Sequence, residues 1–371
     1  MPKHTNVLFL ASSVFGGGAE NHFIRLVPHL LPDARHRLAV SVIAPKELVK
    51  IDGLNFITLN KINRASYFRM IFQLARIINK FKIDLLYSFS RSANFLAFFS
   101  FIFCRKKPFW VVGVNSQPCR AYDLYPSFAG KIRLILKKYI YSTADLVICN
   151  SVSAKKELVE RLRLQPEKIA IARNPVPLEE IKSKALFETE FDFINDCGFL
   201  LSVGRLCEGK GFEALLDVYK QIMNIIPYDL VILGDGPLRS ALESRINKFN
   251  LKKRVHLLGW VENPFPFFRK AELYITASYW EGLPNTVLEA MALGIPVISS
   301  KSTSWIEEFS SLGACKSFPV GDKEALKRVI MEVISNTDIK NSLTAHASKI
   351  IQQFDVKLVA DERNSYLRKF I

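Results

Sequence analysis

The sequence predicts an α/β protein of two domains, each built on a doubly wound parallel sheet with helices on both faces. Three observations predict this class. Short apolar runs of strand length alternate with stretches of helical period in both halves of the chain. The run Asn174-Pro-Val-Pro177 interrupts this alternation near the middle. The chain has 371 residues, enough for two domains that each bury a core of their own.

In the first half, helical periodicity separates several of the apolar runs. Strands are predicted at residues 7–11, 38–43, 55–59, 85–89, 109–114, 145–149 and 169–172, and helices at 20–30, 66–81 and 151–162. Because strands and helices alternate, the strands are expected to be parallel and covered on both faces. The apolar run 93–104 fits a buried helix, since it falls short of the roughly 18–20 residues of a membrane span.

The second half repeats the arrangement. Its predicted strands lie at residues 199–203, 230–233, 255–258, 273–276, 297–299 and 315–318. We place the domain boundary near residue 178, which divides the chain into a first domain (1–178), a second domain (179–354) and a helical tail (355–371). The acidic stretch 178–196 is expected to be a connector with a short helix.

The composition excludes disorder, because 49% of the residues are hydrophobic and 12% are aromatic. The N-terminus leads directly into the strand at 7–11 and lacks the features of a signal peptide. The six cysteines have no C-x-x-C spacing, so reduced thiols in the cytoplasm are expected. Metal ligation and redox chemistry are not indicated.

The formal charge of +16 lies entirely in the first half. Residues 1–178 contain 27 Lys and Arg against 10 Asp and Glu, which gives 27 − 10 = +17, and the rest of the chain gives 24 − 25 = −1. Such a surface suits an anionic acceptor, an anionic membrane surface, or both. Nucleic acid is the competing explanation, but no nucleic-acid-binding motif accompanies the charge, so we expect no nucleic-acid partner.

The segment 127–141 alternates apolar and basic residues at helical spacing. Its basic residues are Lys131, Arg133, Lys137 and Lys138, and its apolar residues include Phe128, Ile132, Ile135 and Tyr139. A helix of this kind lies on an anionic leaflet, or it is a surface helix with one buried stripe and a basic outer face. Both explanations stay open, and the segment 66–82 has a similar character. We expect the protein to bind vesicles that contain anionic lipid, to be released from them by high salt, and to bind neutral vesicles barely.

Glu281 and Glu289 lie in the most informative stretch of the chain. The strand 273–276 precedes them, and Pro284 begins a helix between them, since proline suits a first helical turn. The N–H groups of residues 283–286 would form an anion site at that helix N-terminus. Two carboxylates beside an anion site suit a ligand with many hydroxyls and a diphosphate, such as a nucleotide sugar. Two unremarkable surface glutamates near a helix start are the alternative.

Arg205 and Lys210 follow the strand 199–203. Ligands of open α/β sheets bind at the carboxyl ends of strands, so phosphate contacts are expected here. Transfer of a sugar from a nucleoside diphosphate builds negative charge on the leaving diphosphate, and two fixed cations would stabilise it without a metal. A solvated Arg and Lys on a loop is the other explanation.

Four motifs resemble those of the retaining glycosyltransferases of family 4, in the order that this family has them. They are Gly16-Gly-Gly-Ala-Glu20, Val203-Gly-Arg-Leu-Cys-Glu-Gly-Lys-Gly211, Gly234-Asp-Gly-Pro-Leu-Arg239 and Glu281-Gly-Leu-Pro-Asn-Thr-Val-Leu-Glu289. The resemblance runs from residue 7 to about 354 and implies the GT-B fold, in which two Rossmann-like doubly wound parallel-sheet domains face a central cleft. It implies that a hexose or N-acetylhexosamine moves from a nucleotide sugar to an acceptor held by the first domain, and that the last helix crosses back to that domain.

The resemblance also implies roles for single residues. Arg205, Lys210 and Glu281 would be catalytic, Glu281 would contact the donor sugar, and Glu289 would bind the ribose hydroxyls. The implied donor site comprises Gly17, Gly18, Arg205, Lys210, Gly234, Gly259, Trp260, Val261, Glu281, Gly282, Leu283, Pro284, Asn285, Thr286 and Glu289. Trp260 would stack on the base or is a packed core residue, and the glycines at 16–18 alone would suggest no more than a tight turn.

Asn115 marks a departure from the family, several of whose members carry a histidine there. Asparagine can hydrogen-bond a sugar hydroxyl but cannot titrate near pH 7. The segment Asn263-Pro264 with its phenylalanines resembles relatives that build bacterial surface polysaccharides and lipid-linked glycans, many with UDP-sugars. This likeness implies a polyprenyl-diphosphate-linked acceptor, action at the inner face of the cytoplasmic membrane, and neither metal nor cofactor.

Two other functions are compatible with the same architecture. A UDP-sugar epimerase shares it, but no histidine-and-carboxylate acid/base set is recognisable. A non-catalytic carbohydrate- or membrane-binding protein on a degenerate transferase fold would have no need of Arg205, Lys210, Glu281 and Glu289 together.

Overall fold

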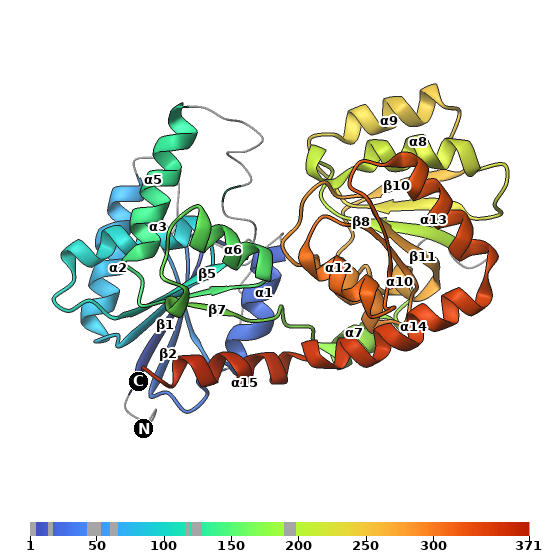
Figure 1. The fold of residues 1–371 in the computed structure, drawn as a ribbon. Helices are drawn as coiled ribbons and strands as arrows, with labels where there is room; N and C mark the ends of the chain where they lie inside the picture. The colour runs from blue at the N-terminus through green and yellow to red at the C-terminus, as the bar shows by residue number, and fades with distance from the viewer. Residues whose placement is uncertain are drawn as a thin grey trace. The chain divides into compact units, whose positions relative to one another are not determined.

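The computed structural model describes residues 5–13, 18–42, 53–59, 66–115, 119, 128–188 and 198–370, with the backbone only for 18–21 and 129. The chain divides into two compact units (Figure 1). The first unit comprises Met1–Pro175 together with Val356–Ile371, and the second comprises Val176–Asp355. Of the helices in the described ranges, none combines the length and the apolar character that a membrane span needs.

The first unit contains a parallel sheet in the order β3-β2-β1-β4-β5-β6-β7. The strands are β1 (Asn6–Ala11), β2 (His36–Ser41), β3 (Asn55–Thr58), β4 (Leu85–Ser88), β5 (Phe109–Val114), β6 (Leu146–Cys149) and β7 (Ile169–Ile171). Chain order reverses between β1 and β4, so the switch point of this sheet lies there.

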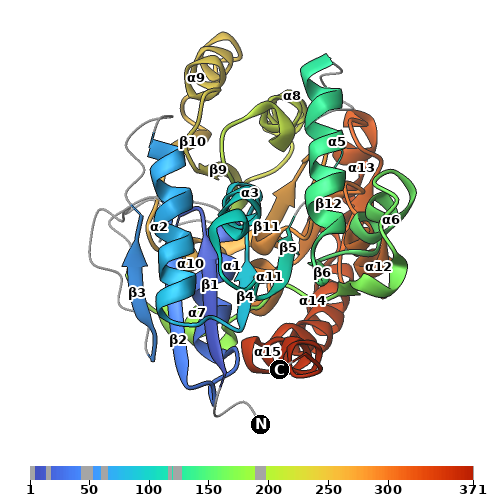
Figure 2. The same cartoon turned by 90° about the vertical axis from the view of Figure 1, so that its left-hand side faces the viewer.

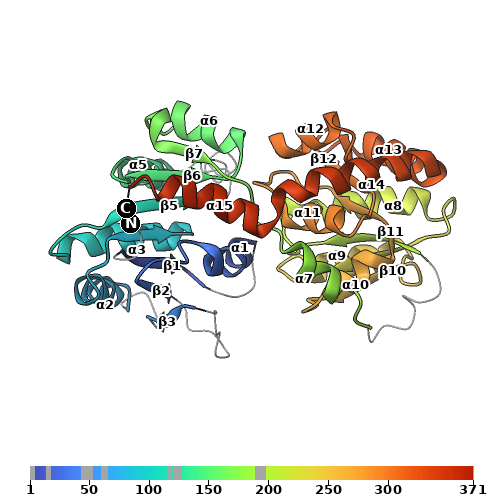
Figure 3. The ribbon, with the colours of Figure 1, turned by 90° about the horizontal axis from the view of Figure 1, so that it is seen from below.

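Helices cover both faces of this sheet. One face is covered by α1 (Gly18–Leu26), the turn η2 (Val27–His29) and α15 (Val356–Leu367), and the other by α2 (Ser66–Lys80), α3 (Arg91–Ser100), α5 (Phe128–Ser142) and α6 (Val152–Glu160). Alternation along each strand produces the two cores: Phe9 packs in the same buried cluster as Val359 of α15, whereas Leu10 packs in the cluster of Leu96 of α3. In Figure 3, α15 lies beside α1.

Arg363 anchors α15 in the first unit. Its side chain is fully buried, donates a hydrogen bond to the carbonyl oxygen of Arg173 at 2.8 Å, and has Nη2 3.2 Å from Nε2 of His22. Next to it, Asn364 Oδ1 accepts a hydrogen bond from the backbone N–H of Leu31 at 2.9 Å. Burial and the charge of Arg363 hold the pKa of His22 well below its usual value, so the imidazole is neutral in the folded protein.

The second unit contains a parallel sheet in the order β10-β9-β8-β11-β12-β13. Its strands are β8 (Phe199–Val203), β9 (Asp229–Leu233), β10 (Val255–Gly259), β11 (Ala271–Thr276), β12 (Val297–Ser300) and β13 (Lys316–Phe318). Its helices are α7 (Leu178–Lys184), α8 (Phe212–Ile222), α9 (Arg239–Lys248), α10 (Phe265–Lys270), α11 (Asn285–Ala292), α12 (Ser304–Ser311), α13 (Lys323–Ser335) and α14 (Thr337–Ile351). Separate buried clusters fill the two faces, and α14 runs beside α11 (Figure 3).

Each predicted strand is present, within one or two residues of its expected limits. Two helix predictions need correction. The helix expected at 20–30 is α1 followed by η2, where Pro28 has no N–H for a continuing helix. The run 93–104 is not buried throughout, because α3 ends at Ser100 and the following turn η3 (Phe101–Phe103) exposes Ile102 and Phe103. Apolar composition predicted the helix but not which of its residues face the sheet.

Candidate active site

The switch point of the second sheet lies between β8 and β11. Strand β9, the next in the chain, pairs with β8 on one side, and β11 pairs with β8 on the other side. The loops that follow β8 and β11 therefore leave the same edge and diverge, which is where open α/β sheets bind ligands. Arg205 and Lys210 lie in the first loop, and Glu281 lies in the second.

Glycines allow the backbones of this edge to pack closely. Gly211 has φ +67°, and a Cβ atom there would lie 2.1 Å from the carbonyl oxygen of Ala277. Gly234 has φ +140°, and its Cβ would lie 1.9 Å from the carbonyl oxygen of Gly204. Both contacts are too short for any side chain, and both φ values disfavour L residues. The glycines of the sequence motifs thus bring the loop after β8 against the neighbouring loops.

Lys210 and Glu281 join the two loops. The ammonium group Nζ of Lys210 forms an ion pair with Glu281 Oε1. Their side chains are 27% and 15% exposed, so the pair is largely withdrawn from water but open on one side. Ser278 Oγ donates a second hydrogen bond to the same Oε1, at 2.9 Å. Within the described part of the chain no hydrogen bond reaches Oε2, so one carboxylate oxygen is available to a ligand hydroxyl.

Buried hydroxyl groups that the sequence did not single out hold this carboxylate in place. Ser278 is fully buried, and its Oγ lies 3.1 Å from Thr276 Oγ1. Ser300 Oγ, at the end of β12, donates to the carbonyl oxygen of Ser278 at 2.5 Å. The sequence contained a signal for these residues, because hydroxyl-bearing side chains occur at the ends of β11 and β12, at the same sheet edge as Glu281.

Glu289 projects from α11, whose first residue follows Pro284. Only 6% of its surface is exposed. On the neighbouring strand, Tyr274 donates its hydroxyl hydrogen to Thr286 Oγ1 at 2.7 Å. Burial raises the pKa of Tyr274, and the charges of Glu281 and Glu289 raise it further. Glu281 lies in the loop before α11, and Glu289 lies on the second turn of that helix.

Arg205 takes no part in this cluster. Its side chain is exposed and forms no ion pair with any residue in the described ranges. From the sequence, Arg205 and Lys210 were expected to act together as a pair of cations. In this structure only Lys210 is held against a carboxylate. Arg205 is left at the solvent-facing side of the same loop.

The remaining predicted donor residues lie along the same edge. The backbone N–H of Gly234 donates to the carbonyl oxygen of Gly259 at 2.7 Å, which places the ends of β9 and β10 side by side. Trp260 is 67% exposed, so it is not a packed core residue. Val261, Asn285 and Thr286 are half-buried, and Gly282, Leu283 and Pro284 are buried.

In the first unit, Asn115 follows β5 and its Nδ2 donates to the carbonyl oxygen of Phe89 at 3.0 Å. Phe89 follows β4, beside the switch point of that sheet, where Ser12 and Ser90 are hydrogen-bonded at 2.7 Å. Asn115 thus lies at the ligand-binding edge of its own unit. Gly17 lies outside the described residues, and Gly18 begins α1.

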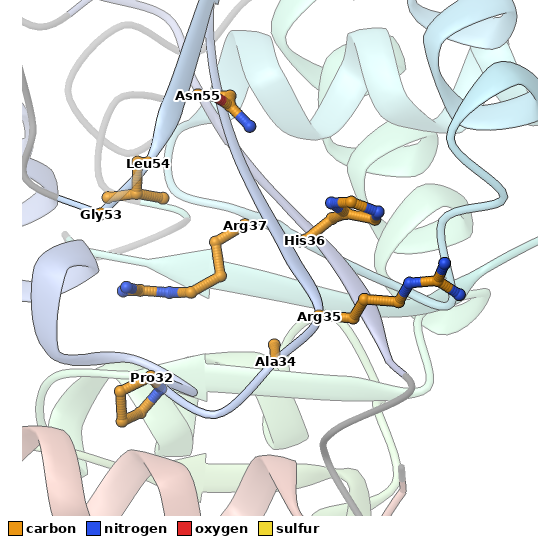
Figure 4. Close-up of a pocket in the computed structure, with 8 residues that line it drawn as sticks. All are labelled: Pro32, Ala34, Arg35, His36, Arg37, Gly53, Leu54 and Asn55. Atoms are coloured by element: carbon orange, nitrogen blue, oxygen red, sulfur yellow. The ribbon is translucent and has the colours of Figure 1, made fainter.

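A pocket of the first unit lies elsewhere (Figure 4). It is lined by Pro32, Ala34, Arg35, His36, Arg37, Gly53, Leu54 and Asn55, at the starts of β2 and β3 and thus at the opposite edge from the carboxyl ends of the strands. The side chains of Arg35 and Arg37 extend in opposite directions in Figure 4. Arg37 Nη2 already donates to the carbonyl oxygens of Val27 and Pro28, both at 2.7 Å. This pocket shares no residue with the predicted site.

No group of three or more histidine, cysteine, aspartate or glutamate side chains is arranged to hold a metal ion in the described ranges. The site at the β8–β11 edge consists of one ammonium group, two carboxylates, buried hydroxyls and a helix N-terminus. Such a site can bind a diphosphate through the cation and the backbone N–H groups, and vicinal hydroxyls through the carboxylates.

Comparison with known proteins identifies both halves of the chain. Residues 16–180 match the family described as Glycosyltransferase Family 4, and residues 188–350 match the family described as Glycosyl transferases group 1. An uncharacterized glycosyltransferase of Methanocaldococcus jannaschii is 30% identical over 262 residues, which cover 68% of this chain and 63% of that protein. This match therefore spans less than two thirds of the relative's length.

A second relative matches over almost its whole length. It is the N-acetylgalactosamine-N,N'-diacetylbacillosaminyl-diphospho-undecaprenol 4-alpha-N-acetylgalactosaminyltransferase of Campylobacter jejuni, 26% identical over 367 residues that cover 96% of this chain and 97% of that protein. Among solved structures, HepE of Anabaena in complex with UDP-glucose superposes with a TM-score of 0.81 at 19% identity, over 99% of this chain and all of that one. The chain therefore belongs to the glycosyltransferases of the group 1 and family 4 type, and its two parallel-sheet units have the GT-B fold.

Proposed function

We propose that this glycosyltransferase moves a hexose or N-acetylhexosamine from a nucleotide diphosphate sugar to a lipid-linked glycan, with retention of the anomeric configuration. The observation that carries the proposal is the Lys210–Glu281 pair across the switch point, beside the start of α11 and the buried Glu289. This set offers a cation and N–H groups to a diphosphate and two carboxylates to the hydroxyls on either side of it.

In the proposed reaction, an acceptor hydroxyl forms a new bond to the anomeric carbon while the bond from that carbon to the diphosphate breaks. The proton of the hydroxyl passes to the leaving phosphate on the same face, and the nucleoside diphosphate departs. Lys210 stabilises the charge that develops on the leaving group, and Arg205 joins it when the donor binds. No metal is needed in this scheme.

The carboxylates and the aromatic side chain orient the donor. Glu289 accepts hydrogen bonds from the two ribose hydroxyls, and Oε2 of Glu281 accepts one from the sugar. Trp260, which is exposed at the end of β10, stacks on the base. Before a donor binds, Glu281 neutralises Lys210, so the diphosphate competes with this carboxylate for the ammonium group.

The acceptor is proposed to be a polyprenyl-diphosphate-linked saccharide, and the donor a UDP-sugar. The Campylobacter relative is named for an undecaprenyl-diphosphate acceptor, and the Anabaena structure contains UDP-glucose. The excess of +17 in residues 1–178 suits the diphosphate of such an acceptor and an anionic leaflet around it. The protein would then act as a peripheral enzyme on the inner face of the cytoplasmic membrane.

The test is incubation with a panel of UDP-sugars and polyprenyl-diphosphate saccharides, followed by mass spectrometry and assignment of the anomeric linkage by NMR. The expected product is longer by one sugar and has the anomeric configuration of the donor. Inversion at the anomeric carbon would refute the retaining mechanism. Release of a C2 epimer without acceptor would indicate an epimerase, and binding of UDP without turnover of any pair would indicate a binding protein.

A further inference from the structure

Exposed apolar side chains occur on neighbouring elements that cover one face of the sheet in the first unit. They come from α2, from the turn η3 and from α5: Phe68, Phe72, Ile102, Phe103, Phe128, Ile132, Ile135 and Tyr139. The largest exposures are 80% for Phe128 and 73% for Phe68. We call these eight residues the aromatic face. Scattered single apolar residues are ordinary on a protein surface, whereas a group of this size on neighbouring elements indicates a contact surface.

The elements of the aromatic face are contiguous. Helix α3 lies between α2 and α5, and it contacts both (Figure 2). The rings of Phe72 and Phe103 have centroids 4.4 Å apart, which joins α2 to η3. The rings of Phe98 and Tyr139 have centroids 5.8 Å apart, which joins α3 to α5. The face is therefore one surface that several helices share.

The elements that form the aromatic face contain basic residues and no acidic ones. No aspartate or glutamate occurs in α2, α3, η3 or α5. Exposed basic residues intersperse the apolar ones: Arg69, Arg76, Lys80, Arg105, Lys106, Lys131, Arg133 and Lys138. An apolar surface interspersed with basic side chains is complementary to a surface that is anionic outside and apolar beneath, as a leaflet with acidic lipids is.

Helix α5 decides between the two explanations that the sequence left open. A surface helix with one buried stripe and a basic outer face would have its apolar residues in that stripe, yet Phe128, Ile132, Ile135 and Tyr139 are all exposed. The helix packs on the core through Leu134, Leu136, Ile140 and Tyr141, and its outer side presents apolar and basic side chains together to solvent. This is the pattern of a helix that lies in a membrane interface.

We infer that the aromatic face docks on anionic lipid bilayers and buries its rings at the boundary between head groups and acyl chains. The inference rests on the proposed function, because a lipid-linked acceptor brings the reaction to a membrane. It also changes the expected mode of binding. Charge alone would be released by salt, whereas buried aromatic area is not screened and holds part of the protein on the bilayer at high ionic strength.

The inference can be tested with the full-length protein in vesicle co-sedimentation. The vesicles contain phosphatidylcholine alone or with a third of phosphatidylglycerol, at about 0.1 M and about 1 M NaCl, which shortens the Debye length from ~10 to ~3 Å. Wild type should bind the anionic vesicles at both salt concentrations, less at the higher. The variant Phe68→Ser/Phe72→Ser/Phe128→Ser/Ile135→Ser should lose binding by roughly tenfold or more at both, since each buried ring contributes apolar area.

Two further variants separate the contributions. In Lys131→Gln/Arg133→Gln/Lys138→Gln, binding should fall at the lower salt concentration and equal that of wild type at the higher one. The control Ile225→Ser/Leu358→Ser removes apolar side chains of similar exposure, 63% and 56%, that lie off the face, and should bind as wild type does. Circular dichroism, measured for each variant, reports whether it is folded. The UDP affinity of each variant reports whether the donor site of the second unit is intact.

Several outcomes would overturn the inference. If the aromatic variant bound like wild type at high salt, the face would not enter the bilayer. If wild type ignored anionic vesicles, or if the aromatic variant changed only a self-association seen by analytical ultracentrifugation, the occupant would be something other than lipid. Sugar transfer to a detergent-solubilised acceptor, assayed in parallel, separates the two proposals. Transfer without vesicle binding would refute only the docking of the aromatic face, and vesicle binding without transfer would refute only the proposed function.

Discussion

Replacing Glu281 by glutamine removes the carboxylate that neutralises Lys210 in the ligand-free protein. Two unit charges about 4 Å apart interact by ~4 kcal/mol at an effective dielectric constant of ~20, and desolvation cancels much of this. The side chains are 27% and 15% exposed, between a surface pair and a fully buried one. We therefore expect the pair to contribute about 1–3 kcal/mol to the stability of the second unit.

A double-mutant cycle with Lys210→Met, Glu281→Gln and the combined variant measures this contribution. Native-state hydrogen exchange of peptides from β11 and β12 reports the unfolding of the second unit alone. The ion pair of Arg239 and Glu243 is the matched control, since both residues lie in the same unit but are 37% and 49% exposed. Its coupling should be about 0.3–0.5 kcal/mol, the usual scale for an exposed pair on a helix.

The same variants test what the pair does in ligand binding. UDP has the diphosphate but not the sugar, so Glu281→Gln should strengthen UDP binding by about tenfold, the equivalent of ~1.4 kcal/mol, because the ammonium group is no longer held by a carboxylate. Lys210→Met should weaken UDP binding and lower kcat by ~100-fold or more, the scale of one lost contact to a developing anion. Isothermal titration calorimetry and initial rates provide these values.

Two results would contradict this prediction. A coupling energy below about 0.3 kcal/mol would mean that the ion pair does not form in solution. UDP binding that is unchanged or weaker in Glu281→Gln would mean that the carboxylate and the diphosphate do not compete for Lys210.

Four further predictions follow from the site and the core. Because the proposed chemistry uses Lys210 in place of a metal, transfer should persist in excess EDTA; complete loss that Mn²⁺ or Mg²⁺ restores would contradict it. Ser278→Ala removes a hydrogen bond of about 1 kcal/mol to Glu281, so kcat/KM should fall about fivefold while UDP affinity stays unchanged, as calorimetry can verify. Gly211→Ala should destabilise the second unit by about 3 kcal/mol or more, because φ is positive and a carbonyl oxygen lies 2.1 Å from the new Cβ. Gly294→Ala, where φ is +72° but the space around the new Cβ is open, should lower the free energy of unfolding by only ~1–2 kcal/mol. Hydrogen exchange measures both values. The pKa of His22 is lowered in the folded protein, so as the pH falls His22 is protonated first in the unfolded chain. The free energy of unfolding should therefore be unaffected by this residue above pH 6.5 and should fall below that pH by up to ~1.4 kcal/mol per pH unit. Urea titrations should find this slope reduced in His22→Gln.

The sequence by itself determined the positions of the strands and, through its motifs, the family to which the chain belongs. Apolar runs alternating with helical periods located each strand to within one or two residues, because burial on both faces of a parallel sheet demands continuous apolar segments. The motif glycines could also be recognised from the sequence, and in the structure Gly211 and Gly234 occupy positions where no side chain fits. Charge asymmetry between the halves, a property of composition, pointed to an anionic partner for the first half.

Tertiary structure alone decided the contacts between distant segments. Lys210 and Glu281 are 71 positions apart and meet because β8 and β11 are neighbours in the sheet, an order that local periodicity does not report. Ser300 reaches the backbone of Ser278 for the same reason. Periodicity also shows which residues are apolar but not which of them another element covers. The exposed side of α5, including Phe128, could therefore be recognised only once the packing of that helix was known.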